Sequence, residues 1–145
     1  MQKFPHHYAV TATTSRDANV DLGSDGLPRI DSAPPAEFGG PGDRWSPETL
    51  LVAAVADCFV LTFKAIARAS KFDWNALTCA AKGTLDRIDN VTRFTEITLH
   101  VVLDVPPGTD EQKAMRFLEK SEHACLITNS LKSSSHLDAT VRIAN

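Results

Sequence analysis

The fold is decided by the stretch SPETLLVAAVADCF, residues 46–59. Ser46 is a good helix N-cap, Pro47 suits the first helical position, and Glu48 suits the positive end of the helix dipole. No proline or glycine follows until beyond Ser70, and apolar residues recur at helical spacing around most of the circumference. The stretch therefore predicts a helix from residue 46 to about residue 70 that is buried on most sides, with a partner subunit able to cover part of it.

Three short extended segments precede this helix. Strand-forming residues are concentrated at 8–14, 19–22 and 27–30, which predicts a small antiparallel meander. Residues 32–47 then contain four prolines and three glycines. This composition predicts a long ordered loop, and ordered loops of this length are often functional.

Two long strands and a second helix are expected after the first helix. Residues 74–88 and 91–105 read as strands joined near Asp89-Asn90, with the turn type left open. The second of these strands has one apolar face, formed by Ile97, Leu99, Val101 and Leu103. A helix over 109–124 and a last strand over 136–143 follow. The order βββ-α-ββ-α-β predicts an α+β fold, a single domain over residues 1–145, with its long central helix packed on an antiparallel sheet.

Composition and charge exclude several classes of protein. The chain has 145 residues, of which 43% are apolar and 23% charged, and its net charge is −3, which disfavours a nucleic-acid-binding role. The longest uninterrupted apolar run has seven residues (50–56), whereas a membrane-spanning helix needs roughly 20. Residues 1–7 lack the apolar segment of a signal peptide. We therefore expect a cytoplasmic protein that binds neither nucleic acid nor membrane.

The three cysteines, Cys58, Cys79 and Cys125, form neither a C-x-x-C pair nor an even set. This pattern disfavours both a disulfide framework and a zinc site, so no metal and no cofactor is expected. In a reducing compartment such cysteines are buried fillers or reactive thiols. Cys79 lies on an apolar strand face and is expected in the core. Cys125 follows the second helix and is expected at the solvent edge, with a buried position in the connection as the alternative.

Four stretches of the chain together resemble the OsmC/Ohr family of small cysteine-dependent peroxidases. They are SRD at 15–17, EFGG at 37–40, SPETLLVAAVADCF at 46–59 and HACLITNSL at 123–131. The resemblance extends over essentially the whole chain and implies an OsmC/Ohr-like fold in an intertwined homodimer. Family members often have proline directly after the second cysteine, where this chain has Leu126.

The resemblance also implies a reaction and a set of site residues. Cys58 would be the peroxidatic cysteine and Cys125 the resolving cysteine of a peroxidase that reduces organic hydroperoxides, with hydrogen peroxide as a second candidate substrate, in the oxidative stress response. Arg16 would stabilise the thiolate and the peroxide, with Arg44 as the rival assignment, and Glu48 would orient the arginine. An external dithiol, in this family often a lipoylated protein, would reduce the resulting disulfide.

The position of Cys58 within its helix shows what its thiolate would need in order to be stable. This residue lies about twelve residues inside its helix, whereas the helix dipole acts only within the first turn. Burial would raise the pKa of its thiol, so a reactive Cys58 needs a nearby fixed cation, and an arginine meets that need. Glu48 lies about 15 Å from Cys58 at 1.5 Å per helical residue, so it can approach such a site only from an antiparallel helix of a second subunit.

Two other functions stay open at the level of sequence. The first is a hydrolase or thiol transferase that uses Cys58 with a histidine base, although the sequence identifies no such histidine. The second is a non-peroxidatic protein that keeps the fold and binds an apolar ligand.

Overall fold

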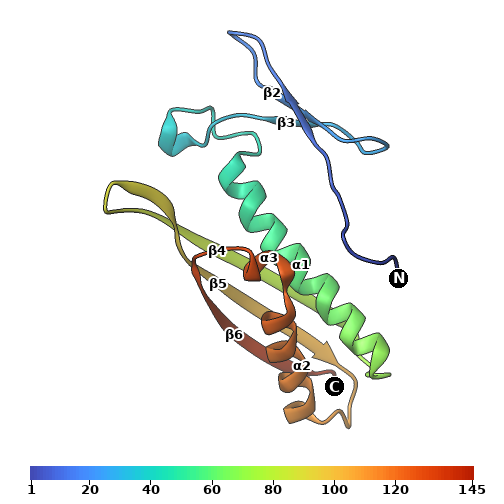
Figure 1. Cartoon of the computed structure of the whole chain (residues 1–145). Coiled ribbons are helices and arrows are strands. Elements are labelled where there is room, and N and C mark those ends of the chain that lie inside the picture. Colours follow the sequence, from blue (N-terminus) through green and yellow to red (C-terminus); the bar gives the residue numbers. More distant parts are fainter. The chain divides into compact units, whose positions relative to one another are not determined.

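The computed structural model describes all 145 residues, which form two compact units, Met1–Leu50 and Leu51–Asn145. In chain order the elements are β1 (Thr11–Thr13), β2 (Val20–Gly23), β3 (Ile30–Ser32), the 3₁₀ helix η1 (Ala36–Phe38), α1 (Pro47–Ala69), β4 (Ala76–Ile88), β5 (Val91–Val105), α2 (Glu111–Ala124), α3 (Leu126–Asn129) and β6 (Ser134–Ile143) (Figure 1). The predicted order βββ-α-ββ-α-β is confirmed, and two short helices, η1 and α3, lie between these elements. A single domain over the whole chain stays a prediction.

The first unit contains the expected meander. Strands β1, β2 and β3 pair antiparallel in that order. The third strand begins at Ile30, later than the predicted residue 27, because a turn closed by the Leu27 N–H to Ser24 C=O hydrogen bond occupies the preceding residues. Proline at position 28 has no N–H to donate to a strand partner.

Helix α1 starts where its sequence predicts. The backbone N–H of Thr49 donates to Ser46 Oγ at 3.2 Å, and the backbone N–H of Ser46 donates to Thr49 Oγ1 at 2.9 Å. This reciprocal pair satisfies donors that the first helical turn leaves without intrahelical partners. The observed end at Ala69 lies one residue from the predicted end.

No helix able to span a membrane was expected from the sequence. By length and composition alone, however, α1 is long and apolar enough to cross a membrane. The core helix of a folded domain meets the same criterion. Within the second unit α1 behaves as a core helix, because Val55, Phe59, Phe63 and Ala67 recur every fourth residue and are buried.

The sheet of the second unit has the order β4-β5-β6. Strands β4 and β5 pair antiparallel through a two-residue turn at Asp89-Asn90, where both residues have positive φ (51° and 62°), as a type I′ hairpin requires. Strand β6 pairs with β5 in parallel, so the sheet is mixed and not antiparallel as expected. The reason is that α2 and α3 return the chain to the end of the sheet where β5 begins.

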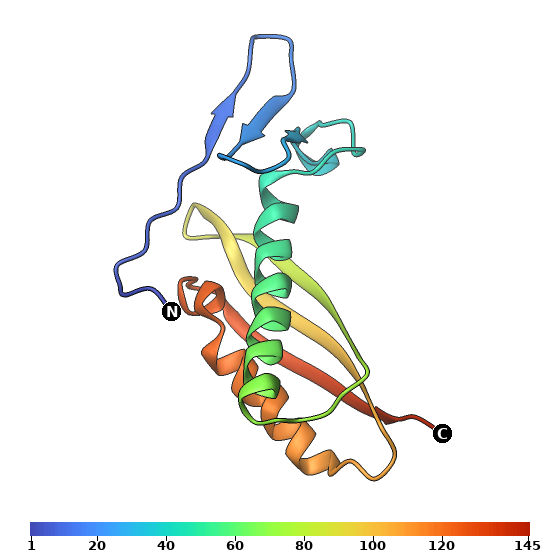
Figure 2. The ribbon, with the colours of Figure 1, turned by 90° about the vertical axis from the view of Figure 1, so that its right-hand side faces the viewer.

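Helices α1 and α2 cover the same face of this sheet (Figure 2). Every second residue of β5 points into the core between sheet and helices: Ile97, Leu99, Val101, Leu103 and Val105 are all buried. Ala114 and Leu118 complete the core from α2. The predicted alternation of β5 is therefore confirmed, and the core fixes the middle of α1 against the sheet.

Candidate functional site

The second unit brings Cys58 and Cys125 together. Cys58 lies in the middle of α1, and Cys125 separates α2 from α3. The Cys125 thiol donates to the backbone carbonyl of Val55, three residues before Cys58, with a sulfur–oxygen distance of 4.0 Å. Cys58 is close enough that its own thiol contributes to the raised pKa of Cys125. Two thiols that are far apart in the sequence are thus neighbours in space.

Opposing effects act on the pKa of Cys125. Burial raises it, and the neighbouring Cys58 thiol raises it further. The hydroxyl of Thr128, which donates to Cys125 Sγ at 3.2 Å, lowers it. Burial prevails, so Cys125 is a protonated thiol under conditions where a free cysteine begins to ionise.

The expected position of Cys125 at the solvent edge is wrong. The residue is fully buried, with 0% of its surface exposed. Helix α3 starts directly after it, and the backbone N–H of Asn129 donates to the carbonyl of Cys125 at 3.0 Å. The first turn of α3 therefore lies next to Cys125 and places Thr128 at its sulfur, whereas the next residue, Leu126, is exposed with 66% of its surface accessible.

Cys79 is a third thiol in the same region. It lies on β4, is partly buried and packs against the hydrophobic core, in agreement with its prediction as a core residue. Burial raises the pKa of Cys79 to about 11, and the nearby Cys125 contributes to the increase. At neutral pH this thiol is protonated and therefore a weak nucleophile.

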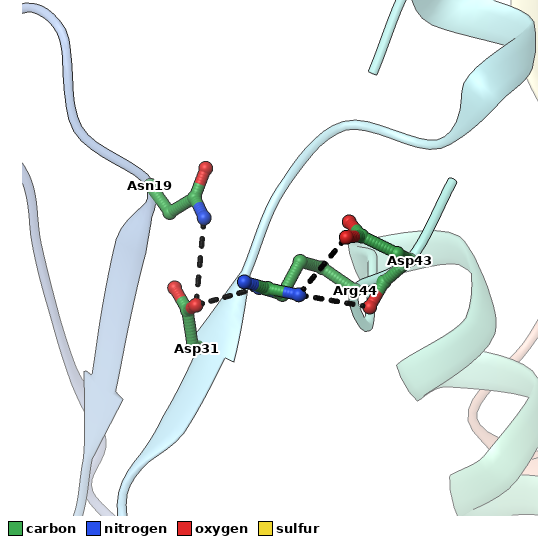
Figure 3. Close-up of polar contacts among 4 residues, drawn as sticks. All are labelled: Asn19, Asp31, Asp43 and Arg44. Atoms are coloured by element: carbon green, nitrogen blue, oxygen red, sulfur yellow. Dashed lines mark hydrogen bonds and ion pairs between the residues drawn. The ribbon is translucent and has the colours of Figure 1, made fainter. Parts of the chain in front are cut away.

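The two candidate arginines lie in the first unit and differ in their partners. Arg44 forms ion pairs with Asp31 at 2.8 Å and with Asp43 at 3.2 Å, and Asn19 donates a further hydrogen bond to Asp31 (Figure 3). Arg16, in the turn after β1, is exposed and forms no ion pair and no side-chain hydrogen bond within the chain. Of these two arginines, Arg16 is therefore the one whose guanidinium is free to bind another group.

Glu48 lines an apolar pocket that belongs entirely to the first unit. The pocket has a volume of about 510 Å³, and its other lining residues are Ala12, Val20, Leu22, Ser32, Ala33, Pro34, Pro35, Phe38, Pro47 and Leu50. The Oε2 atom of Glu48 is buried there without a hydrogen-bond partner. A buried carboxylate oxygen without a donor is energetically unfavourable, so this atom is suited to accept a hydrogen bond from a cationic group.

The predicted site residues thus fall into two groups. Cys58 and Cys125 lie together in the second unit, whereas Arg16 and Glu48 belong to the first. Sequence reasoning missed Thr128 and the carbonyl of Val55 as partners of Cys125. The spacing of Thr128, three residues after a cysteine that caps α3, was the available signal. The chain has no group of three or more histidine, cysteine, aspartate or glutamate side chains arranged to hold a metal ion.

Known proteins resemble this chain in sequence and in fold. Uncharacterized protein YmaD of Bacillus subtilis is 26% identical over 115 residues, which cover 75% of this chain and 76% of that protein. An OsmC-like protein of unknown function from Vibrio cholerae superposes with a TM-score of 0.84 at 19% identity, covering 94% of this chain and 100% of that one. An organic hydroperoxide resistance protein from Elizabethkingia anophelis superposes with a TM-score of 0.78 at 25% identity, covering 99% and 100%.

These likenesses agree on one fold, the α+β fold of the OsmC and organic hydroperoxide resistance proteins. The family profile described as OsmC-like protein matches residues 40–140, a range that contains both Cys58 and Cys125 and most of the chain. The chain belongs to the OsmC-like protein family.

Proposed function

We propose that this protein is a thiol-dependent peroxidase that reduces organic hydroperoxides through Cys58 and Cys125. The observation that carries the proposal is the direct neighbourhood of these two thiols on α1 and at the start of α3. The organic hydroperoxide resistance protein of Elizabethkingia anophelis, 25% identical over nearly the full length, supports the same conclusion.

Exposure distinguishes the roles of the two cysteines. Cys58 is partly accessible, so a hydroperoxide can reach it, whereas Cys125 is fully buried. The raised pKa of Cys125 keeps this thiol protonated while the first step takes place. Cys58 is therefore the peroxidatic cysteine and Cys125 the resolving cysteine in this proposal.

The reaction has two steps before reduction. The Cys58 thiolate attacks one oxygen of the hydroperoxide, the O–O bond breaks, and the departing alkoxide takes a proton to leave as an alcohol. Cys58 is now a sulfenic acid. The Cys125 thiolate attacks the Cys58 sulfur, the S–O bond breaks, and the hydroxide leaves as water. An external dithiol, such as a lipoylated protein, reduces the Cys58–Cys125 disulfide by exchange.

Features of the first unit support a homodimeric site. Glu48 has a buried oxygen without a donor, and Arg16 has no carboxylate partner within the chain. An arginine next to Cys58 would stabilise its thiolate, which its position in mid-helix requires. We therefore assign the thiolate-stabilising role to Arg16, oriented by Glu48, with these groups completing the thiol site in a dimer of two copies.

Apolar surface near the two cysteines, and in the pocket beside Glu48, favours organic hydroperoxides over hydrogen peroxide as substrates. Leu61, one turn after Cys58 on α1, and Leu126, next to Cys125, are 56% and 66% exposed. The pocket beside Glu48 is lined almost entirely by apolar side chains. An alkyl or aryl group gains free energy when it leaves water for such a surface, and hydrogen peroxide has no such group.

Steady-state kinetics test this proposal. Consumption of cumene hydroperoxide and of hydrogen peroxide is measured with dihydrolipoamide as the reductant. We expect turnover with both, a higher kcat/KM for cumene hydroperoxide, complete loss in Cys58→Ser, and retention in the matched control Cys79→Ser. Turnover that survives in Cys58→Ser would remove the proposal. Ester hydrolysis without peroxide consumption would instead favour a Cys58-dependent hydrolase.

A further inference from the structure

The sulfur of Cys125 is held from two sides by groups that no motif identified. Thr128 Oγ1 donates a hydrogen bond to Cys125 Sγ at 3.2 Å. On its other side, the thiol of Cys125 donates to the carbonyl of Val55 on α1, with a sulfur–oxygen distance of 4.0 Å. The sulfur therefore has a hydroxyl donor on the side of α3 and an acceptor on the side of α1, where Cys58 lies.

This arrangement is fixed by burial and by the backbone of α3. Cys125 is fully buried and Thr128 is partly buried, so water does not replace the hydroxyl as the donor. Cys125 is the N-cap residue of α3 and Thr128 is its third helical residue. The start of α3 thus brings the hydroxyl to the sulfur, because the N-cap residue and the third residue of a helix lie within reach of each other.

We propose that Thr128 is a positioning residue for disulfide formation: its hydroxyl holds the Cys125 sulfur beside Cys58 and remains its hydrogen-bond donor when Cys125 becomes a thiolate. This inference rests on the proposed peroxidase function. It adds to that function a residue that acts on the second step alone, because Thr128 contacts the resolving sulfur and the hydroperoxide reacts with Cys58.

The chemistry of the second step explains why such a donor matters. Cys125 must lose its proton before its sulfur attacks the Cys58 sulfenic acid, and burial opposes the negative charge that results. A hydrogen bond to a charged group is stronger than one to a neutral group, so the Thr128 hydroxyl favours the thiolate over the thiol. The charge is consumed when the S–S bond forms and hydroxide takes up a proton to leave as water.

The backbone N–H of Thr128 also favours the charge on Cys125, whereas the neighbouring thiols oppose it. Cys58 on α1 and Cys79 on β4 are the titratable groups that interact with Cys125, and a second thiolate would repel the first. From α2, Glu122 directs its carboxylate to Ser135, whose hydroxyl donates to it at 2.9 Å. Thr128 is therefore the side chain that offsets part of the cost of ionising Cys125.

Two substitutions separate the hydroxyl from the shape of the side chain. Thr128→Val removes the donor and keeps the branched shape, whereas Thr128→Ser keeps the donor. Both are placed in the full chain, and also in a Cys58→Ser/Cys79→Ser background where Cys125 is the only thiol. Ultraviolet absorbance of the thiolate, followed against pH in that background, gives the pKa of Cys125 without any need for peroxide.

The kinetic measurement uses the full chain with one equivalent of cumene hydroperoxide. Acid quenching followed by mass spectrometry gives the rates of Cys58 sulfenic acid formation and of disulfide formation separately. For Thr128→Val we expect a higher pKa of Cys125, an unchanged first step, disulfide formation slowed roughly tenfold and more sulfinic acid at Cys58. Thr128→Ser is expected to restore the values of the unsubstituted protein.

The outcomes that overturn the inference differ from those that overturn the proposed function. If Thr128→Val forms the disulfide at the unsubstituted rate with an unchanged pKa of Cys125, the role of Thr128 is wrong and the peroxidase proposal stands. If the unsubstituted protein forms no disulfide at all, the peroxidase proposal is wrong and the role of Thr128 fails with it.

Discussion

The thiol of Cys125 donates a hydrogen bond to the backbone carbonyl of Val55, which precedes Cys58 on α1 by one turn. This contact joins the start of α3 to the middle of α1. The acceptor belongs to a residue of the hydrophobic core, so the second sulfur lies beside a well-packed part of α1. The thiols of Cys58 and Cys125 are therefore already neighbours in the reduced protein.

Replacement of the buried thiol separates the two steps of the reaction. In Cys125→Ser the first step is expected to proceed at its normal rate, because Cys58 keeps its surroundings on α1. Without a resolving thiol, the sulfenic acid persists and a second peroxide converts it to a sulfinic acid. Mass spectrometry should show one turnover followed by an addition of two oxygens on Cys58. Multi-turnover activity at the normal rate in this variant would contradict the resolving role.

The two arginines give opposite predictions. Arg16→Gln is expected to lower kcat/KM for cumene hydroperoxide by roughly ten- to a hundredfold, the value of a lost hydrogen bond to a charged group. Arg44→Gln is the matched control, because Arg44 is already paired with Asp31 and Asp43 and should affect activity little. A larger loss in Arg44→Gln than in Arg16→Gln would reverse the assignment.

The third thiol yields a pH prediction. The pKa of Cys79 is raised to about 11 in the folded protein from an ordinary value of 9.0. Between these two pKa values the folded state keeps the proton of Cys79, whereas the unfolded chain loses it. The contribution of the protonated Cys79 thiol to the free energy of unfolding is therefore complete below about pH 9 and declines as the pH rises toward 11. Urea unfolding midpoints should fall over this range, and less so in Cys79→Ala. An equal fall in both proteins would show that Cys79 does not carry the effect.

A close approach at Gly83 predicts a loss of stability on substitution. A Cβ atom at this position of β4 would lie 2.8 Å from Phe94 Cε1 and 2.8 Å from Val52 Cγ2. Because both neighbours belong to packed elements of the second unit, Gly83→Ala is expected to lower the free energy of unfolding by about 1–3 kcal/mol. Lys82→Ala, at the exposed neighbouring position, is the control for urea denaturation. Equal midpoints for both variants would contradict the packing described.

The sequence alone predicts those parts of the fold that local patterns determine. The start of α1 follows from Ser46 and Pro47, whose positions are readable as a cap and a first helical residue. The two long strands β4 and β5 follow from alternation and from a turn of two residues at Asp89-Asn90. In each case the deciding interactions lie within a few residues along the chain.

The parts that could not be predicted depend on contacts between distant segments. The parallel pairing of β6 depends on where α2 and α3 return the chain, which no local pattern encodes. Burial of Cys125 likewise depends on its contact with α1 at Val55, 70 residues earlier in the chain, so a position just past a helix end does not reveal it. The resemblance selected the two cysteines, but their surroundings, including Thr128, needed the structure.

Peptide mapping of the protein after one equivalent of cumene hydroperoxide tests the central claim most directly. Alkylation of the remaining thiols before digestion preserves the products, and dithiol treatment of a second sample shows whether they are reversible. We predict a peptide pair linked through Cys58 and Cys125, with Cys79 still a free thiol and the linkage removed by dihydrolipoamide. Three intact thiols after excess peroxide, or a linkage that leaves out Cys58, would contradict the account.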